Sequence, residues 1–428
     1  MSPQCAGRFH ISCRNNLRRG PLLPNPKRTD HVFRHPAAVP AYRPDIYTRA
    51  AILDPYPHYR AMRELGPVVW LARHRLYALP RYAECKATLR DDGRYLSGHG
   101  VAANPLTNRL SRGTTLNSDG ADHDRRRKLV AHRLMPRSLR SLGDDVDTQA
   151  RSLVDDAVRR GTVDAVADLA TALPLAVVPD LVGWPRDERA HLLNWAAATF
   201  DILGPANWQA LKAVPRSLHM LRFARRVVRE RNVLPGSMAH ELLTAVDEDG
   251  LAAEDVPPLL IDYIAPSLDT TISAISSALY LFATHPEQWH LLKEEPALLS
   301  NAVNEIVRFE SPLRAFTRKV LQETEIGGTQ LPAGARVLVM YASANRDERE
   351  WDAPDVFDIR NNAGRHVGFG SGAHACAGQG LARLETTAML QALIERVDRI
   401  EIAAEPTWAV NNVIHRHEHL PVRLIPAA

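Results

Sequence analysis

One cysteine near the C-terminus lies in a glycine-rich loop within residues 369–383, which read FGSGAHACAGQGLAR. Glycines let the backbone turn sharply and let other groups approach closely, because they carry no Cβ. Apolar residues then recur at helical spacing from Leu381 to Met389, which predicts a helix directly after the loop. A sulfur just before a helix meets free N–H groups, and these favour the thiolate over the thiol. The stretch therefore indicates that Cys376 holds a metal.

The number of sulfur ligands narrows the choice of metal. A structural zinc site needs four ligands, and no second cysteine lies near Cys376 in the sequence. Haem iron needs only one axial thiolate. A buried cysteine in a glycine-rich turn, with no metal at all, is the alternative that a lone cysteine leaves open.

The spacing F-x-x-G-x-H-x-C-x-G-x-x-x-A resembles the signature of the cytochrome P450 family. The matching positions are Phe369, Gly372, His374, Cys376, Gly378 and Ala382. The resemblance implies a fold that is mostly α with minor β (α+β), built as one large haem-binding domain. It also implies haem b (iron protoporphyrin IX) as the cofactor, with Cys376 as the ligand of the haem iron and with Phe369 and Gly370 in the loop that binds the cofactor.

Composition and charge separate one large body from an N-terminal segment. The chain has 428 residues, 45% of them hydrophobic, and no linker-like tract follows the first forty residues. We expect the haem domain to span residues 41–428. Without residues 1–35, the formal net charge of +4 becomes slightly negative. We expect residues 1–40 to be a disordered basic extension, or the product of a start codon assigned too far upstream.

The same features argue against several function classes. A body without excess positive charge is not a nucleic-acid binder by charge, so a nucleic-acid arm or a targeting peptide is the alternative only for residues 1–35. The sequence contains no apolar leader and no stretch suited to span a membrane, so we expect no membrane partner. Four irregularly spaced cysteines do not form a disulfide framework, which favours the cytoplasm.

The pattern of apolar residues predicts short strands followed by long helices. Residues 68–71 and 76–79 flank a short polar turn and are typical of a hairpin. Residues 121–307 are predicted to be nearly all helix, interrupted by turns such as Gly143-Asp144. Residues 320–340 alternate again, with a turn at 327–328.

Glu305 and Arg308 form a second recognisable group. Residues three apart share one face of a helix, so the two side chains can pair. Such a pair is common and, when exposed, weak. The resemblance implies that it is structural here, and that Arg360 completes it and anchors the segment before the cysteine loop.

Residues 259–283 form an apolar run that contains Pro266 and the pair Asp269-Thr270. An interior proline removes one helix hydrogen bond, so we expect a kink. The resemblance implies that the helix opens there as a groove for dioxygen, and that Asp269 and Thr270 are catalytic groups of a proton-delivery chain. The alternative is that Thr270 bonds back to its own helix. The family commonly has Gly or Ala where this chain has Pro266 and Ser267.

His123 and Arg127 lie one helical turn apart and point the same way. The resemblance implies that this pair binds the haem propionates together with Arg318 and His374, because buried carboxylates need such donors. Arg125, Arg126 and Lys128 supply further cations on the outer face. They are either an ordinary solvated charge run or a docking surface for an acidic electron donor.

The resemblance extends over the body and implies a monooxygenase that activates O2 to hydroxylate a small organic substrate. No flavin or iron–sulfur domain is recognisable, so we expect a separate ferredoxin and an NAD(P)H-dependent reductase as electron donors. A peroxygenase or isomerase, a haem-binding sensor or carrier, and an enzyme for another hydrophobic metabolite are the alternatives. Similarity to bacterial members that O-demethylate methoxybenzoates or guaiacol-type phenols occurs in residues 262–271, 308–312, 342–347 and 376–380.

The resemblance to these O-demethylases implies a small aromatic substrate and a set of pocket residues: Arg94, Ser97, Ala265 and Phe316. Acid-binding members have polar or basic groups where this chain has Ile261 and Asp262. A second carboxylate would be repelled there. We therefore expect a neutral methoxyphenol to be preferred, with Arg94 and Ser97 as the anchors if an acid binds.

Overall fold

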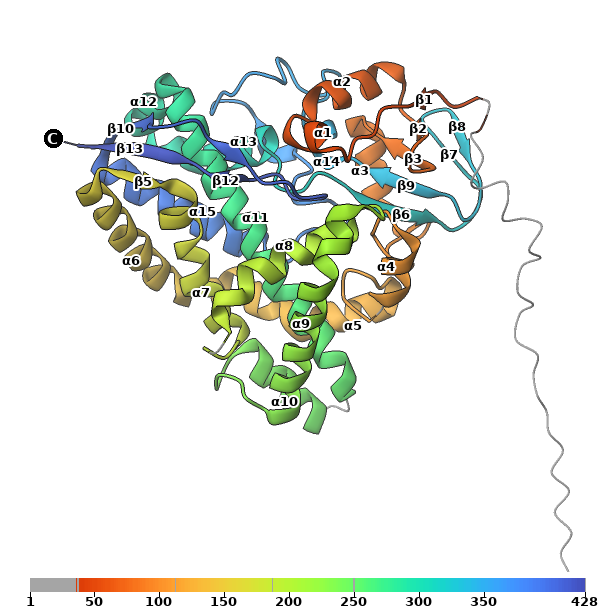
Figure 1. The fold of residues 1–428 in the computed structure, drawn as a ribbon, viewed down its shortest axis with the longest axis horizontal. Coiled ribbons are helices and arrows are strands. Elements are labelled where there is room, and N and C mark those ends of the chain that lie inside the picture. The colour runs from red at the N-terminus through yellow and green to blue at the C-terminus, as the bar shows by residue number, and fades with distance from the viewer. Residues whose placement is uncertain (1–35, 37, 112, 187, 249–250, 428) are drawn as a thin grey trace, which may run out of the picture. The chain divides into compact units, whose positions relative to one another are not determined.

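The computed structural model describes residues 36, 38–111, 113–186, 188–248 and 251–427 (Figure 1). The body is mainly helical with small sheets and forms a single domain, as the sequence predicts. The prediction for residues 1–35 lies outside the described residues. Val39 and Pro40, assigned to the extension, belong to the folded body: Val39 is buried, and the Pro40 carbonyl accepts a hydrogen bond from Trp70 N–H.

The long helix α11 (Val256–Thr284) is the centre of the body, with most of its side chains buried. It runs through the middle of Figure 1 and contacts α7 (Ala172–Val182), α8 (Leu192–Leu203), α9 (Trp208–Glu230) and α15 (Gln379–Arg396). A helix with apolar residues on nearly all sides is stable only when it is enclosed in this way. It ends at His285, directly before Pro286, because the residue before a proline disfavours helical dihedrals.

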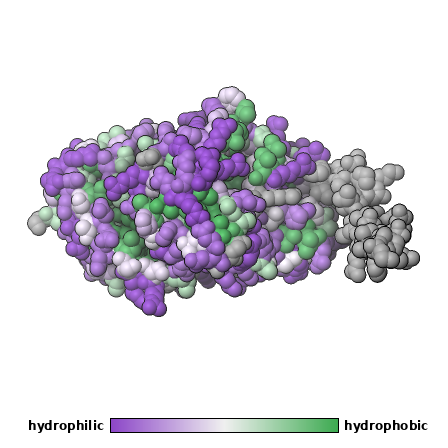
Figure 2. Space-filling view, turned by 90° about the horizontal axis from the view of Figure 1, so that it is seen from below, coloured by the Kyte–Doolittle hydropathy of each residue, from purple (hydrophilic) through white to green (hydrophobic). Residues whose placement is uncertain are grey.

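Further helices complete the body, some of them packed on α11 and others beside the largest sheet. The longer ones are α2 (Tyr56–Leu65), α3 (Tyr82–Arg90), α5 (Gly120–Ala131), α6 (Pro136–Arg160), α10 (Met238–Glu248), α12 (Pro286–Glu294) and α13 (Leu299–Phe309). The short ones are α1 (Arg49–Leu53), α4 (Pro105–Leu110) and α14 (Tyr341–Ala344). Single turns are η3 (His132–Leu134), η4 (Val166–Ala170), η5 (Arg189–His191), η6 (Ala253–Asp255), η7 (Pro296–Leu298) and η8 (Ala363–Arg365). The face seen in Figure 2 is mostly hydrophilic, with hydrophobic side chains in small groups, as expected when apolar faces pack inward.

The largest sheet has the strand order β1-β2-β3-β9-β6-β4. Its strands are β1 (Ala41–Tyr42), β2 (Val69–Leu71), β3 (Leu76–Leu79), β4 (Tyr95–Leu96), β6 (Phe316–Val320) and β9 (Arg336–Val339). The predicted hairpin is confirmed, since β2 and β3 pair antiparallel. The strands predicted within residues 320–340 are confirmed as well, with β7 (Thr324–Ile326) and β8 (Thr329–Leu331) joined at 327–328.

A second sheet, β10-β13-β5, lies at the opposite side of Figure 1. It consists of β5 (Thr162–Asp164), β10 (Val397–Ile402) and β13 (Pro421–Pro426), while β11 (Thr407–Trp408) pairs with β12 (His417–His419). The strand β5 interrupts the region predicted to be helical. It is a strand because β13, from the far end of the chain, supplies its hydrogen-bonding partner, which local periodicity does not reveal.

The turn predicted at Gly143-Asp144 is wrong. Both residues lie inside α6, which continues from Pro136 to Arg160. Glycine within a helix costs only about 1 kcal/mol relative to alanine, and the packing of α6 along α15 outweighs that cost.

Candidate functional site

The loop before α15 is shaped by two glycines with positive φ. Gly370 has φ of 72° and Gly372 has φ of 74°. A Cβ on Gly372 would lie 2.3 Å from the carbonyl oxygen of Leu89, at the end of α3, so a larger residue cannot fit. The Cys376 N–H donates to the Phe369 carbonyl at 2.8 Å, which closes the loop and fixes the position of the cysteine.

The Cys376 residue is accessible, whereas Cys85 is buried. The protein around the sulfur raises the pKa of the Cys376 thiol by desolvation, and the N–H groups of Gly378 and Gln379 oppose this together with Arg127 and Arg383. The helix end therefore stabilises the thiolate, as predicted, but the surrounding protein outweighs it. A metal cation at the sulfur would reverse the balance, because a coordinating thiol loses its proton.

Four side chains predicted to bind propionates lie in this loop or near it. His123 and His374 have ring centroids 4.3 Å apart. The Arg127 guanidinium donates to the Ala375 carbonyl at 2.7 Å, and Arg318 is buried on β6. His123 Nε2 is buried without a hydrogen-bond partner. Since buried polar groups are nearly always paired, this unpaired nitrogen and the nearby cations fit a bound carboxylate-bearing group such as haem.

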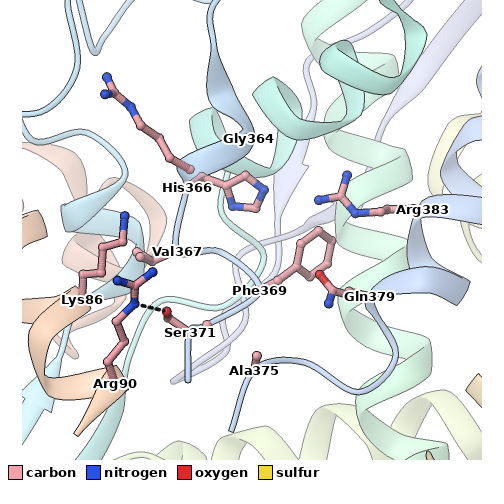
Figure 3. Close-up of a pocket in the computed structure, with 12 residues that line it drawn as sticks. Lys86, Arg90, Gly364, His366, Val367, Phe369, Ser371, Ala375, Gln379 and Arg383 are labelled. Atoms are coloured by element: carbon pink, nitrogen blue, oxygen red, sulfur yellow. Dashed lines mark hydrogen bonds between the residues drawn. The ribbon is translucent and has the colours of Figure 1, made fainter. Parts of the chain in front are cut away.

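A basic hollow lies beside the cysteine loop (Figure 3). Its cationic lining residues are Lys86, Arg90, Arg365 and Arg383. The Arg90 side chain donates to Ser371 Oγ at 3.2 Å, and the Arg383 guanidinium lies 4.9 Å from the centroid of the Phe369 ring. Two of the cations thus contact the loop itself, so a molecule bound in the hollow would lie against the loop that carries Cys376.

The acid-alcohol pair of α11 lies on an unbroken helix. The helix continues through Pro266, and Thr270 Oγ1 donates to the Pro266 carbonyl at 2.6 Å, as the alternative from the sequence predicts. Asp269 is buried, and its Oδ1 lies 2.8 Å from Arg416 Nε. Its Oδ2 is buried without a partner. Burial raises the pKa of the Asp269 carboxyl, and Arg416 opposes this shift.

The pair Glu305–Arg308 is fully buried and bidentate, with both N···O distances at 2.7 Å. Arg308 also donates to the carbonyls of Asn345 and Pro354, each at 2.9 Å, so it fastens α13 to the segment before the cysteine loop.

Arg360 is not part of this network, contrary to the prediction. Its guanidinium is exposed and pairs with Glu295 at 2.6 Å. Its neighbour Asn361 donates to Glu305 Oε1 at 3.0 Å instead. A neutral amide suffices because Arg308 already balances the one buried carboxylate.

The predicted pocket residues fall into two groups. Ala265, Phe316 and Ser97 are buried, and Ser97 Oγ has no hydrogen-bond partner. Arg94 does not belong with them: its side chain is 53% exposed and pairs with Asp91. Arg94 lies in the turn between α3 and β4, where a long charged side chain extends into water.

Asp262 has a different role from the one predicted. Its Oδ2 accepts hydrogen bonds from the N–H groups of Thr115 and Leu116, so it fastens a loop to α11. Burial raises the pKa of its carboxyl to about 7. These hydrogen bonds occupy the carboxylate, which weakens the argument that Asp262 repels an acidic substrate.

Sequence reasoning missed Arg416, Asn361 and the cations of the basic hollow. Arg416 is far from Asp269 in the sequence, and no spacing rule links them. The hollow combines side chains of α3 with the loop before α15, which only the fold brings together. Asn361 is adjacent to Arg360 in the sequence, but the charge of Arg360 favoured Arg360 as the predicted partner of Glu305.

Comparison with known proteins gives a consistent result. Residues 187–400 match the family model described as Cytochrome P450. The chain is 36% identical to cytochrome P450 CYP199A2 of Rhodopseudomonas palustris, over 92% of this chain and 96% of that protein. It is 30% identical to 6-deoxyerythronolide B hydroxylase of Saccharopolyspora erythraea, over 89% and 98%.

Solved structures agree with the sequence matches. The epothilone B-bound cytochrome P450epoK superimposes with a TM-score of 0.79 at 26% identity, over 90% of this chain and 100% of that one. No helix within the described ranges is long and apolar enough to cross a membrane. The chain belongs to the cytochrome P450 family and is a monooxygenase with a haem-thiolate cofactor.

Proposed function

We propose that Cys376 is the ligand of the haem iron, and that His123, Arg127, Arg318 and His374 hold the propionates. The unpaired, buried His123 Nε2 beside the cysteine loop is the observation that supports this assignment most directly. When bound, the haem supplies the activation of O2 that hydroxylates a C–H bond. The protein positions the substrate, excludes water and delivers protons.

Asp269 and Thr270 are the groups proposed to handle those protons. Thr270 Oγ1 donates its own hydrogen to the Pro266 carbonyl, so its lone pairs remain free to accept a further hydrogen bond. Asp269 Oδ2 is buried and unpaired, so it can take up and release a proton without first breaking another hydrogen bond. Electrons are proposed to come from a separate ferredoxin and reductase, as the resemblance implies.

The proposed reaction is O-demethylation of a small aromatic methyl ether. Hydroxylation of the methyl carbon gives a hemiacetal, which collapses to a phenol and formaldehyde. Buried Phe316 and Ala265 are the proposed apolar contacts with the ring. The proposal rests on the resemblance described above, because the name of the 36% identical relative states no substrate.

We propose that a neutral phenol such as guaiacol is preferred over a benzoate. The position of Arg94 supports this preference for a neutral phenol, whereas repulsion by Asp262 no longer does. Arg94 pairs with Asp91 on the surface, so it is not placed to neutralise a buried carboxylate. Ser97, buried with an unpaired hydroxyl, is a polar anchor that suits a neutral phenol or methoxy oxygen.

The cofactor assignment is tested with Cys376→His and the matched control Cys85→Ala. Purified wild-type protein should give the ferrous carbonyl spectrum of a thiolate adduct. Cys376→His should lose that spectrum and the oxygenation, whereas Cys85→Ala should keep the spectrum, since Cys85 is buried outside the loop. A thiolate spectrum that survives in Cys376→His contradicts the assignment.

The substrate is tested by formaldehyde release with a surrogate ferredoxin and reductase. Guaiacol is compared with 4-methoxybenzoate and 4-methoxycinnamate, and binding is followed by the spin-state shift. We expect Ser97→Ala to weaken guaiacol binding about tenfold, the cost of one lost hydrogen bond of about 1.4 kcal/mol, and Arg94→Ala to change it little. Tight, coupled turnover of the acids with loss of their binding in Arg94→Ala would reverse the preference.

We further propose that an acidic ferredoxin docks on the basic hollow. The cationic docking surface that the sequence predicts at Arg125, Arg126 and Lys128 is smaller than expected, because Arg126 is buried and pairs with Asp122 and Asp255. Four cations line the hollow beside the cysteine loop, which favours an acidic partner. Lys86→Glu and Arg90→Glu should slow reduction by the ferredoxin and weaken its salt dependence, while dithionite reduction stays unchanged. Equal ferredoxin rates in wild type and variants would exclude this surface.

A further inference from the structure

The carboxylate of Asp269 has a partner from the far end of the chain. Arg416 directly precedes β12, the strand that pairs with β11 and contacts α11. Only folding brings this guanidinium to the middle of the central helix. We infer that Arg416 is a positioning residue: it fixes one oxygen of Asp269 and leaves the other free to exchange a proton, an inference that rests on the proposed proton delivery by Asp269.

The contacts of Arg416 fix its orientation. Nε lies 2.8 Å from Asp269 Oδ1, and Nη1 donates to the His417 carbonyl at 3.0 Å. Nη1 also lies 3.4 Å from Glu418 Oε2. Because Oδ1 is engaged by Nε while Oδ2 is buried and unpaired, the two oxygens of Asp269 are not equivalent. Proton exchange is therefore directed to Oδ2.

The exposure of these side chains forms a gradient. The Asp269 side chain is 3% exposed, that of Arg416 17%, and that of Glu418 51%. The pair thus connects a buried carboxyl to a group in water. A guanidinium does not give up its proton in proteins, so Arg416 does not carry protons itself. It acts by position and charge.

The charged groups near Asp269 come from several elements. Burial raises the pKa of Asp269, Arg416 lowers it, and Glu418 raises it further. From α8, Asp201 also interacts with Asp269, and Arg216 and Arg314 act on Asp201. Removing Arg416 would leave two acids and no direct cation at Asp269. The pKa of the Asp269 carboxyl would then rise further.

The segment that carries Arg416 has other anchors, so a loss of its side chain need not detach the strand. Ser273 Oγ of α11 donates to the His415 carbonyl, and the Ala409 N–H donates to the Arg416 carbonyl at 3.0 Å. The His417 ring stacks on Trp408 with centroids 3.8 Å apart. These contacts do not use the guanidinium, which makes Arg416→Gln an informative variant.

The test compares Arg416→Gln, Arg416→Lys, Asp269→Asn and the double variant as haem-loaded, full-length proteins. The matched control is Arg399→Gln, which removes an exposed Arg–Glu pair of β10. Infrared difference spectra against Asp269→Asn report the carboxylic-acid band of Asp269 during a pH titration. We expect Arg416→Gln to raise the midpoint by at least one pH unit, about a tenfold change in proton affinity. Arg416→Lys and Arg399→Gln should stay near wild type.

Coupled turnover gives the second readout. Arg416→Gln should lose up to about tenfold in rate, in proportion to the lost ionised fraction, and recover as the pH rises. The double variant should be no slower than Asp269→Asn. An unchanged infrared midpoint, or losses that multiply in the double variant, would overturn the inference. A shifted midpoint in a protein that oxidises no aromatic ether would support the inference and count against the proposed substrate class alone.

Discussion

At the scale of single residues, the pair Glu305–Arg308 shows what spacing can predict. Two residues on one helix keep a fixed separation, so the sequence alone placed them together. Their third partner lies on another segment, and there the sequence favoured the charged Arg360. The structure uses Asn361, since the buried carboxylate already has its counter-charge in Arg308. The charge balance of the buried pair therefore determines that Asn361, and not Arg360, is its third partner.

Arg308→Ala should therefore destabilise the fold far more than Arg360→Ala. Removing Arg308 leaves the fully buried Glu305 without its cation, which costs about 3–5 kcal/mol. Arg360 belongs to an exposed pair, which contributes little. Urea unfolding of the haem-loaded proteins measures both. Arg308→Lys covers the case in which Arg308→Ala does not fold, since it keeps the charge and should lose less. Equal destabilisation by Arg308→Ala and Arg360→Ala would contradict the network described above.

At the scale of elements, the sequence predicted what depends on neighbours and missed what depends on distant segments. The hairpin β2–β3 and the helix after Cys376 follow from local periodicity and turn residues. The strand β5 and the pairing of Asp269 with Arg416 follow from the C-terminal strands, which return to β5 and to α11. Glycine positions predicted turns only in part, because the sequence does not show at which glycine a larger side chain would collide with its neighbours.

Two glycine substitutions should have opposite effects. Gly372→Ala would force a Cβ to 2.3 Å from the Leu89 carbonyl at a positive φ, so α3 and the cysteine loop must separate. We expect poor haem incorporation and a lower melting temperature. Gly143→Ala meets no atom within 4 Å and should stabilise α6 by about 1 kcal/mol. Haem content and thermal melting measure both, and a Gly372→Ala protein with normal haem content would contradict the close contact.

At the scale of the whole molecule, buried and half-buried titratable groups shape how stability depends on pH. Burial raises the pKa of Asp201 to about 6, of Asp262 to about 7 and of Glu385 to about 8. Both carboxyl oxygens of Glu385 lack hydrogen-bond partners. Glu310 behaves differently: burial raises its pKa, but His415 and Arg346 outweigh burial and hold it at about 2.

The sign of each contribution follows from these shifts. An acid whose pKa is raised by folding binds its proton more tightly in the folded state, so its contribution is complete below about pH 4 and is lost as the pH rises through the folded-state value. Glu310 contributes in the opposite sense, and its stabilisation is lost only as the pH falls toward about 2. Burial lowers the pKa of His366 and of His417 to about 3, so these groups oppose folding as the pH falls below their unfolded value of about 6.5. We expect maximal stability at about pH 6 to 7, with a decline on the order of a few kcal/mol toward pH 8.

Glu385→Gln tests this expectation. The variant keeps the size of the side chain and removes its titration, so the decline between about pH 5 and 8 should shrink. Melting temperatures measured from about pH 5 to 9 in matched buffers give the comparison. A wild-type melting temperature that rises between about pH 7 and 8 would show that the buried acids do not govern the stability of the domain in that range.

The contrast between the two described cysteines has a consequence for handling the protein. Alkylating agents and oxidants can reach the exposed Cys376, which oxidants can convert as far as sulfinic acid, whereas the buried Cys85 is shielded. The raised pKa of the Cys376 thiol slows these reactions at neutral pH without preventing them. With Cys376 as the proposed ligand of the haem iron, molecules that lose their cofactor cannot bind it again once Cys376 is oxidised, because a sulfinic acid is not reduced back by ordinary thiols. Mass-spectrometric counting of iodoacetamide adducts at Cys376 would thus report the haem-free fraction of a preparation, and storage under reductant would preserve the ability of that fraction to be reconstituted.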